Sequence, residues 1–195
     1  DLPDFDFMVG GFPCQTFSII GNRCGLDDDE RGQIIYGLVR ILQAKDVKYF
    51  ILENVKGLIN HDKGNTLKVV LKLLDDAGYR VYYEVLNSLN FGVPQMRERI
   101  YFVGVKKELV DDSFRYEFPK KYSGKSESLE ECLIECDRTL IFDESLPAYQ
   151  TFYKYLDNKY NKGKYNIDKL LSHEYRVLDT RQSDLRIYHN KTPTL

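Results

Sequence analysis

Hydrophobic and polar positions follow two different periods over the first half of the chain. Four short runs are mainly apolar or rich in β-branched and aromatic residues, which is typical of strands: Phe5–Val9, Val47–Leu52, Val81–Leu86 and Arg99–Val105. Two longer segments, Gly32–Ala44 and Asn65–Ala77, carry apolar residues at three- and four-residue spacing and are expected to be amphipathic helices. The alternation of strands with helices predicts an α/β fold with a mostly parallel sheet.

Chemically reactive side chains lie where the first two predicted strands end. Cys14 follows the first strand in a Gly-Gly-Phe-Pro-Cys-Gln segment, and Glu53 ends the second strand. Ligand sites of open α/β sheets lie beyond the carboxyl ends of the strands. We therefore expect Cys14 and Glu53 to face the same crevice.

The strand–helix alternation fades after Lys107. A short helix is expected within Glu127–Glu135, whereas Tyr149–Tyr165 is polar, rich in tyrosine and ambiguous. Residues 146–195 hold nine basic and five acidic side chains, although the whole chain has a formal net charge of −2. This modest basic bias is either an ordinary solvated surface or a face that meets phosphates.

Composition narrows the class of protein. A hydrophobic content of 43% is sufficient for a packed core. Four cysteines in 195 residues do not make a disulfide scaffold, and Cys132 and Cys136 lack the second pair of ligands typical of a zinc site. The sequence contains no signal peptide and no apolar run of membrane length. We therefore expect a cytoplasmic protein with no metal and no membrane association.

Cys14 has two interpretations. A single cysteine is most often a small core residue, but a loop after a strand is a poor place for one. Pro13 restricts the backbone just before the thiol, and the preceding glycines allow a substrate to approach closely. A thiolate in this loop can add to C6 of a pyrimidine. Thymidylate synthases also attack C6 from a Pro-Cys pair, so this motif alone leaves the substrate open.

Glu53, Arg97 and Arg99 also allow two interpretations each. A carboxyl group at the end of a buried strand is costly unless it is paired or used, so Glu53 either caps the next turn or binds the edge of a base. Arg97 and Arg99 are two residues apart and share a face of an extended segment. They are either solvated strand-edge residues or two cations that reach one pocket.

Four segments together resemble one family closely. In order and spacing, Gly11–Ser18, Arg31-Gly32, Glu53–Val55 and Gln95–Arg99 are similar to the motifs of DNA (cytosine-5) methyltransferases. The resemblance covers residues 1–107 and continues more weakly to Leu195. It implies a Rossmann-like, S-adenosylmethionine-dependent methyltransferase fold whose mostly parallel sheet has an antiparallel final strand. It also implies a catalytic core at 1–107 and a connection into the target-recognition region at 108–195.

The resemblance assigns catalytic roles to four residues. Cys14 would be the nucleophile that adds to C6 of cytosine. Glu53 would contact N3 and the exocyclic amine of the base. Arg97 and Arg99 would lie on the O2 side of the base and order Glu53.

Five further residues are implied as binding residues. Pro13 and Ile34 would contact S-adenosylmethionine. Gln15 and Ser18 would contact double-stranded DNA, and Arg31 would end the loop that closes over it. The cytosine would have to leave the duplex, because its C6 face is stacked there.

Some parts of the family pattern do not occur in this sequence. They are the opening Phe-x-Gly-x-Gly turn, the acidic residue that binds the cofactor ribose and the last two motifs. We therefore expect these 195 residues alone to be inactive and to bind the cofactor weakly, or to be completed by another polypeptide.

The expected function is that of a bacterial restriction–modification enzyme that acts at the nucleoid. It would methylate C5 of cytosine in duplex DNA through a covalent adduct. One alternative is a tRNA cytosine-5 methyltransferase with the same motifs. The other is a non-catalytic DNA-binding or partner subunit that retains them.

Overall fold

The computed structural model divides the chain into two compact units, one formed by residues 1–87 and 98–120 and the other by 88–97 and 121–195. The residues that it describes are 2–13, 34–124, 128–132, 145, 147–166, 169–170, 176–179 and 185–193. Each unit has its own hydrophobic core. The assignment of catalytic and recognition roles to residues 1–107 and 108–195 stays a prediction.

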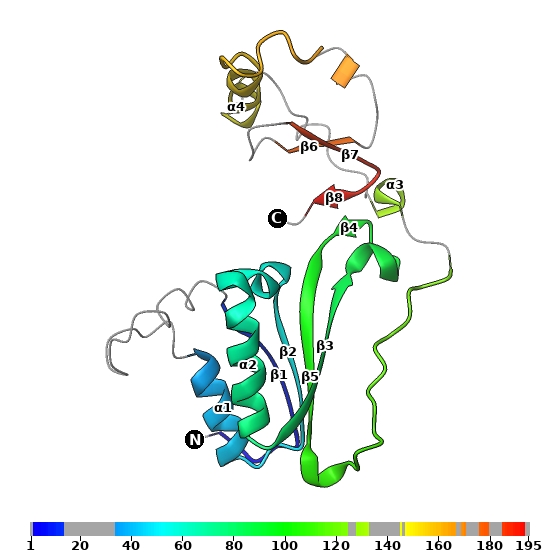
Figure 1. Cartoon of the computed structure of the whole chain (residues 1–195). Coiled ribbons are helices and arrows are strands. Elements are labelled where there is room, and N and C mark those ends of the chain that lie inside the picture. The colour runs from blue at the N-terminus through cyan, green and yellow to red at the C-terminus, as the bar shows by residue number, and fades with distance from the viewer. Residues whose placement is uncertain are drawn as a thin grey trace, which may run out of the picture. The chain divides into compact units, whose positions relative to one another are not determined.

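A four-stranded sheet forms the centre of the first unit (Figure 1). Its order is β1-β2-β5-β3, and the strands are β1 (Phe7–Gly11), β2 (Tyr49–Val55), β5 (Glu98–Lys106) and β3 (Tyr79–Asn87). β1 pairs with β2 in parallel, and β5 pairs antiparallel with both β2 and β3. Three strands therefore share one direction and the final strand, β5, opposes them. This confirms the predicted mostly parallel sheet with an antiparallel final strand.

Two amphipathic helices cover one face of this sheet, and Figure 1 shows them side by side. They are α1 (Ile34–Ala44) and α2 (Asn65–Asp76). Their buried apolar residues pack on Phe50, Leu52 and Phe102, none of which is exposed to solvent. Each such buried side chain contributes about 1.5–3 kcal/mol of transfer free energy. The apolar side chains that predicted these helices are thus the ones that pack in this core.

The predicted position of Glu53 at the end of its strand is wrong. β2 continues to Val55, because its ladder with β5 extends as far as the pair Val55 and Arg99. The apolar run ends at Leu52, but strand pairing does not need apolar side chains. Glu53 therefore lies within a paired strand, in register with Gly11 of β1 and Tyr101 of β5.

The second face of the sheet is more open. Phe7, Val9 and Tyr49 on this face are 50%, 68% and 43% exposed. Near β3, the Tyr82 hydroxyl donates to the Phe114 carbonyl at 2.7 Å and the two rings pack edge to face.

Short 3₁₀ segments connect the strands and helices of this unit at Lys56–Ile59, His61–Gly64 and Lys107–Leu109.

The second unit contains short elements. They are the 3₁₀ segment Ser88–Phe91, β4 (Gln95–Met96), α3 (Leu129–Cys132), α4 (Pro147–Leu156), β6 (Arg176–Asp179), β7 (Arg186–His189) and β8 (Thr192–Pro193). β4 pairs with β8 in parallel, and β6 pairs antiparallel with β7. The ambiguous segment after Tyr149 is thus helical as far as Leu156.

A helix long and apolar enough to cross a membrane does not occur among the residues described. The same residues contain no cluster of three or more histidine, cysteine or carboxylate side chains suited to a metal ion.

Candidate active site

Two strands of the first unit present opposite charges to each other. The carboxylate oxygen Oε1 of Glu53, on β2, lies 2.8 Å from Nε of Arg99, on β5. The Arg99 side chain is 14% exposed and the Glu53 side chain 33%. Because the guanidinium is largely shielded, water and salt screen this ion pair less than a surface pair. A planar guanidinium at this distance also restricts the orientation of the carboxylate.

A glycine on the neighbouring strand leaves the carboxylate accessible. Gly11 ends β1 in register with Glu53. A Cβ atom at Gly11 would lie 3.4 Å from Oε2 of Glu53, so any side chain there would contact that oxygen. The residue type at this position therefore decides whether a ligand can reach Glu53 from the β1 side.

A buried amide connects β2 to the end of β1. Asn54 is 2% exposed, and its Nδ2 donates to the Phe12 carbonyl at 2.8 Å. Its Oδ1 accepts a hydrogen bond from the Val55 amide, also at 2.8 Å. The Phe12 amide donates to the Glu53 carbonyl at 3.3 Å. The two bonds made by Phe12 hold the chain after β1 to β2, up to the residue before Pro13.

Not all predicted site residues are described. Cys14, Gln15, Ser18 and Arg31 lie outside the described residues. Glu53 and Arg99 are brought together as an ion pair.

Three other predicted residues are described at separate places. Pro13 is exposed after the end of β1, and Ile34 is the first residue of α1 and 41% exposed. Arg97 belongs to the second unit, where its amide and carbonyl bond to Ser88 at 3.2 and 3.1 Å. That Arg97 and Arg99 reach one pocket therefore stays a prediction.

The sequence led us to expect that the glycines before Pro13 admit a substrate and that Asn54 helps to shape the end of the strand, but not that Gly11 faces Glu53 or that Asn54 bonds to Phe12. Phe50, Leu52 and Asn54 occupy alternate positions of β2 and are all buried. A polar amide at the third core-facing position of an apolar strand is a signal that the sequence contains, because a buried amide needs hydrogen-bond partners. The contact of Gly11 with Glu53 has no comparable signal, since it depends on which strands pair.

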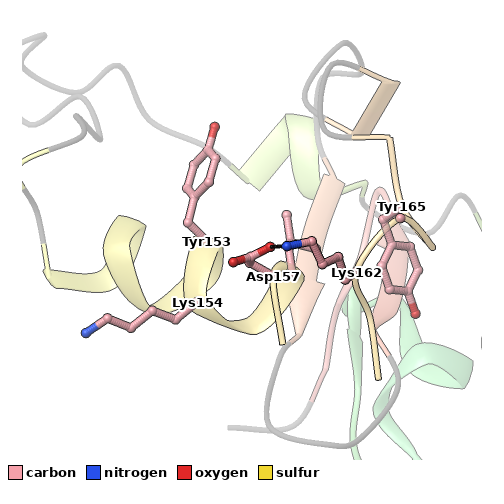
Figure 2. Close-up of a pocket in the computed structure, with 7 residues that line it drawn as sticks. Tyr153, Lys154, Asp157, Lys162 and Tyr165 are labelled. Atoms are coloured by element: carbon pink, nitrogen blue, oxygen red, sulfur yellow. Dashed lines mark ion pairs between the residues drawn. The ribbon is translucent and has the colours of Figure 1, made fainter. Parts of the chain in front are cut away.

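The second unit has a hollow of its own, of about 500 Å³, beside α4 (Figure 2). Nζ of Lys162 and Oδ1 of Asp157 form an ion pair there at 3.2 Å, and both side chains are more than 70% exposed. Nearby, Nζ of Lys159 lies 4.7 Å from the centre of the Tyr160 ring. The hollow is lined by Tyr153, Lys154, Leu156, Asp157, Lys162, Gly163 and Tyr165. These are the residues of a solvated surface with a positive bias.

Known proteins with similar sequences share one family description. A family model described as C-5 cytosine-specific DNA methylase matches residues 1–192. The type II methyltransferase M.HaeII of Haemophilus aegyptius is 50% identical over 133 residues, which are 68% of this chain and 40% of that protein. The orphan methyltransferase M.SPRI of Bacillus phage SPR is 48% identical over 121 residues, or 62% of this chain and 27% of that protein. The chain thus spans less than half of these relatives.

Solved structures have a similar fold. A DNMT2 variant of Spodoptera frugiperda is 29% identical with a TM-score of 0.51, over 68% of this chain and 40% of that one. The Dnmt2 methyltransferase of S. pombe has a TM-score of 0.52 at 19% identity, over 77% of this chain and 45% of that one. These similarities, together with the sheet order, support the predicted fold class.

Proposed function

The chain belongs to the C-5 cytosine-specific DNA methylase family, and from this premise we propose that it supplies the catalytic core of a DNA (cytosine-5) methyltransferase. The observation that carries the proposal is the Glu53–Arg99 ion pair beside Gly11, at the end of the strand that leads into Pro13 and Cys14. Since the chain spans 40% of M.HaeII, the proposal concerns the complete gene product that contains these residues.

Cys14 and Glu53 would act on the same cytosine. The Cys14 thiolate forms a bond to C6, and the electron pair of the C5–C6 double bond becomes available at C5. In its protonated form Glu53 donates a proton or a strong hydrogen bond at N3, which makes C6 electrophilic. After C5 has taken the methyl group, a base removes the C5 proton and the thiolate leaves. As the thiolate leaves, N3 returns its proton to Glu53, and the base releases the C5 proton to water.

The two arginines would support this chemistry in different ways. Arg99 holds the Glu53 carboxylate in one orientation, so the carboxyl group meets N3 without first losing rotational freedom. Arg97 would lie on the O2 side of the base, where negative charge develops as sulfur adds. Support for the first role is the 2.8 Å ion pair; the second role rests on the motif.

S-adenosylmethionine supplies the methyl group when it is bound. The exposed apolar side chain of Ile34, at the start of α1, suits a contact with an aromatic or aliphatic part of a ligand. Pro13, exposed just after β1, fits the same type of contact. We assign these two residues to one wall of the cofactor site. On their own they supply mainly apolar contact, so we expect weak cofactor binding by the 195 residues in isolation.

Double-stranded DNA is the proposed substrate, with the target cytosine extruded from the stack. Gln15 and Ser18 would contact the DNA, and the segment that ends at Arg31 would close over it. The lysine- and tyrosine-rich surface around α4 suits phosphate contacts in the second unit. A restriction–modification role at the bacterial nucleoid, and completion by a second polypeptide, are parts of the same proposal.

Transfer of labelled methyl groups tests the proposed function. The complete gene product is incubated with labelled S-adenosylmethionine and, in parallel, with duplex DNA or tRNA. We expect 5-methylcytosine in the DNA and no label in the tRNA. Label only in the tRNA would support the RNA alternative, and DNA binding without any transfer would support a non-catalytic subunit.

A further inference from the structure

The third core-facing position of β2 carries an amide in place of an apolar side chain. Asn54 follows Phe50 and Leu52 at two-residue spacing and is in register with Ile100 of β5, which is fully buried. Burying an amide without partners costs a few kcal/mol, so a residue of this type persists in a core only where its polar atoms are used.

Both ends of the Asn54 amide are used within the same strand pair. Nδ2 reaches across to the Phe12 carbonyl, 42 residues earlier in the chain, and Oδ1 accepts from the amide of Val55. The β1–β2 ladder ends with Gly11 and Glu53, and the Phe12 amide adds one more backbone bond to the Glu53 carbonyl. The Asn54 side chain therefore extends the connection between the strands one step past the ladder.

The carbonyl that Asn54 binds belongs to the peptide bond between Phe12 and Pro13. This peptide unit is planar, so holding its oxygen also holds the nitrogen of Pro13. The proline ring restricts φ to about −65°. Between the clamped peptide and the nitrogen of Cys14, only ψ of Pro13 remains a soft dihedral angle. The side chain of Phe12 adds to the restraint, since it is 5% exposed and its ring lies 6.2 Å from that of Phe102.

We propose that Asn54 is a positioning residue that fixes where the Pro13-Cys14 segment leaves the sheet relative to Glu53. We call the hydrogen bond from Asn54 Nδ2 to the Phe12 carbonyl the clamp. Asn54 directly follows Glu53 in β2, so one strand carries both the carboxyl group and the clamp. This inference rests on the proposed function, in which Cys14 and Glu53 act on one base. A displacement of about 1 Å between reacting groups can cost about 10²-fold in rate.

The variant Asn54→Asp tests the clamp, because it keeps the size of the side chain and replaces the amide donor with a carboxyl group. When this carboxyl group is ionised it repels the Phe12 carbonyl oxygen, whereas in its protonated form it can again donate a hydrogen bond to that oxygen. Burial and the facing carbonyl raise the pKa of a carboxyl group at this position. The defect should therefore be largest at alkaline pH and should diminish as the pH falls, which a general loss of packing would not reproduce.

In the complete gene product with S-adenosylmethionine, the rate of covalent adduct formation between Cys14 and a duplex containing 5-fluorocytosine is measured at several pH values. The rate of each variant is divided by the wild-type rate at the same pH. We expect Asn54→Asp to form the adduct about 10–100-fold more slowly at pH 8 and to regain about tenfold by pH 6, with DNA affinity nearly unchanged. Thr66→Val is the matched control, since Thr66 is also buried (3% exposed) and bonds to His61 in the same unit. Its relative rate should not vary with pH.

A second readout does not require catalysis. Hydrogen exchange of the Phe12 amide, corrected for the intrinsic effect of pH, should be about tenfold faster in Asn54→Asp at pH 8 and unchanged in Thr66→Val. In Asn54→Ala the corrected exchange of the Phe12 amide should be equally fast at every pH. This variant replaces Asn54→Asp in the test if Asn54→Asp does not fold. Unchanged exchange of Phe12 in both Asn54 variants, or a relative rate that is independent of pH, overturns the inference. A wild-type protein that forms no adduct contradicts the proposed function instead, and the exchange measurement still decides on the clamp.

Discussion

Arg99 on β5 and Glu53 on β2 form an ion pair, with Nε of the guanidinium 2.8 Å from Oε1 of the carboxylate. The residues are 46 positions apart in the sequence but lie on adjacent strands. The guanidinium is the more buried partner, at 14% exposed against 33%. A shielded cation that orients a more accessible anion is an arrangement suited to presenting a carboxyl group to a ligand.

Replacing Arg99 should reduce methyl transfer through Glu53. Arg99→Lys keeps the charge but loses the planar fork that restricts the carboxylate, so we expect kcat to fall about 10-fold, and about 10²-fold for Arg99→Gln. Lys56→Gln is the control beside the same strands, since Lys56 begins the 3₁₀ segment directly after β2 and its partner Glu98 begins β5. It breaks the exposed pair with Glu98, which is 2.8 Å long and of a type worth at most about 1 kcal/mol. Equal losses in the Lys56 and Arg99 variants would count against the role of Arg99.

Glu53 should act on the base and not on the fold. Glu53→Gln keeps the volume of the side chain but cannot donate a proton to N3. General acid catalysis is typically worth about 10²–10⁴-fold, so the turnover rate of the complete gene product should fall within that range at a similar melting temperature. A turnover rate within about twofold of wild type would remove Glu53 from the mechanism.

Two adjacent glycines provide a comparison of the two sheet faces. In Gly11→Ala the new methyl group would lie 3.4 Å from Oε2 of Glu53, whereas in Gly10→Ala it would lie 3.6 Å from Cδ2 of Leu52, on the core side. We expect Gly11→Ala to fold normally and to lose about tenfold or more in kcat/KM, because the methyl group covers the carboxylate. Gly10→Ala should retain activity. The reverse order of the two activities would show that accessibility of Glu53 from β1 is unimportant.

The sequence predicted those features that depend on local burial. The helix expected at Asn65–Ala77 is observed at Asn65–Asp76, because its buried face imposes a period that can be recognised without knowing the partner. Pairing between distant strands has no such local signal. The extension of β2 to Val55 depends on pairing with Arg99, and the clamp of Asn54 on Phe12 joins residues 42 positions apart. The motifs indicate the site residues, but not how those residues support one another.

The basic surface of the second unit should contribute to DNA affinity. Two lysines of this surface lie over tyrosine rings: Lys159 over Tyr160, and Lys164 with its Nζ 5.6 Å from the centre of the Tyr165 ring. Removing both charges in Lys159→Gln with Lys164→Gln should lower the slope of log affinity against log salt by up to about 0.9 for each phosphate that these lysines neutralise. The control is Lys72→Gln in α2 of the first unit, whose amine pairs with Asp76 at 2.7 Å. Binding is measured by fluorescence anisotropy at several salt concentrations. An unchanged slope would show that these lysines face solvent and make no contact with DNA phosphates.

Trapping of the covalent adduct tests the central claim most directly. Fluorine at C5 cannot leave as a proton, so a duplex with 5-fluorocytosine at the target should hold the enzyme on C6 after methyl transfer. Mass spectrometry of the complete gene product with this duplex and S-adenosylmethionine should find the nucleotide attached to the peptide that contains Cys14. Cys14→Ser should bind the duplex and form no adduct. An adduct that persists in Cys14→Ser, or that maps to another residue, would contradict the assignment of Cys14 as the nucleophile.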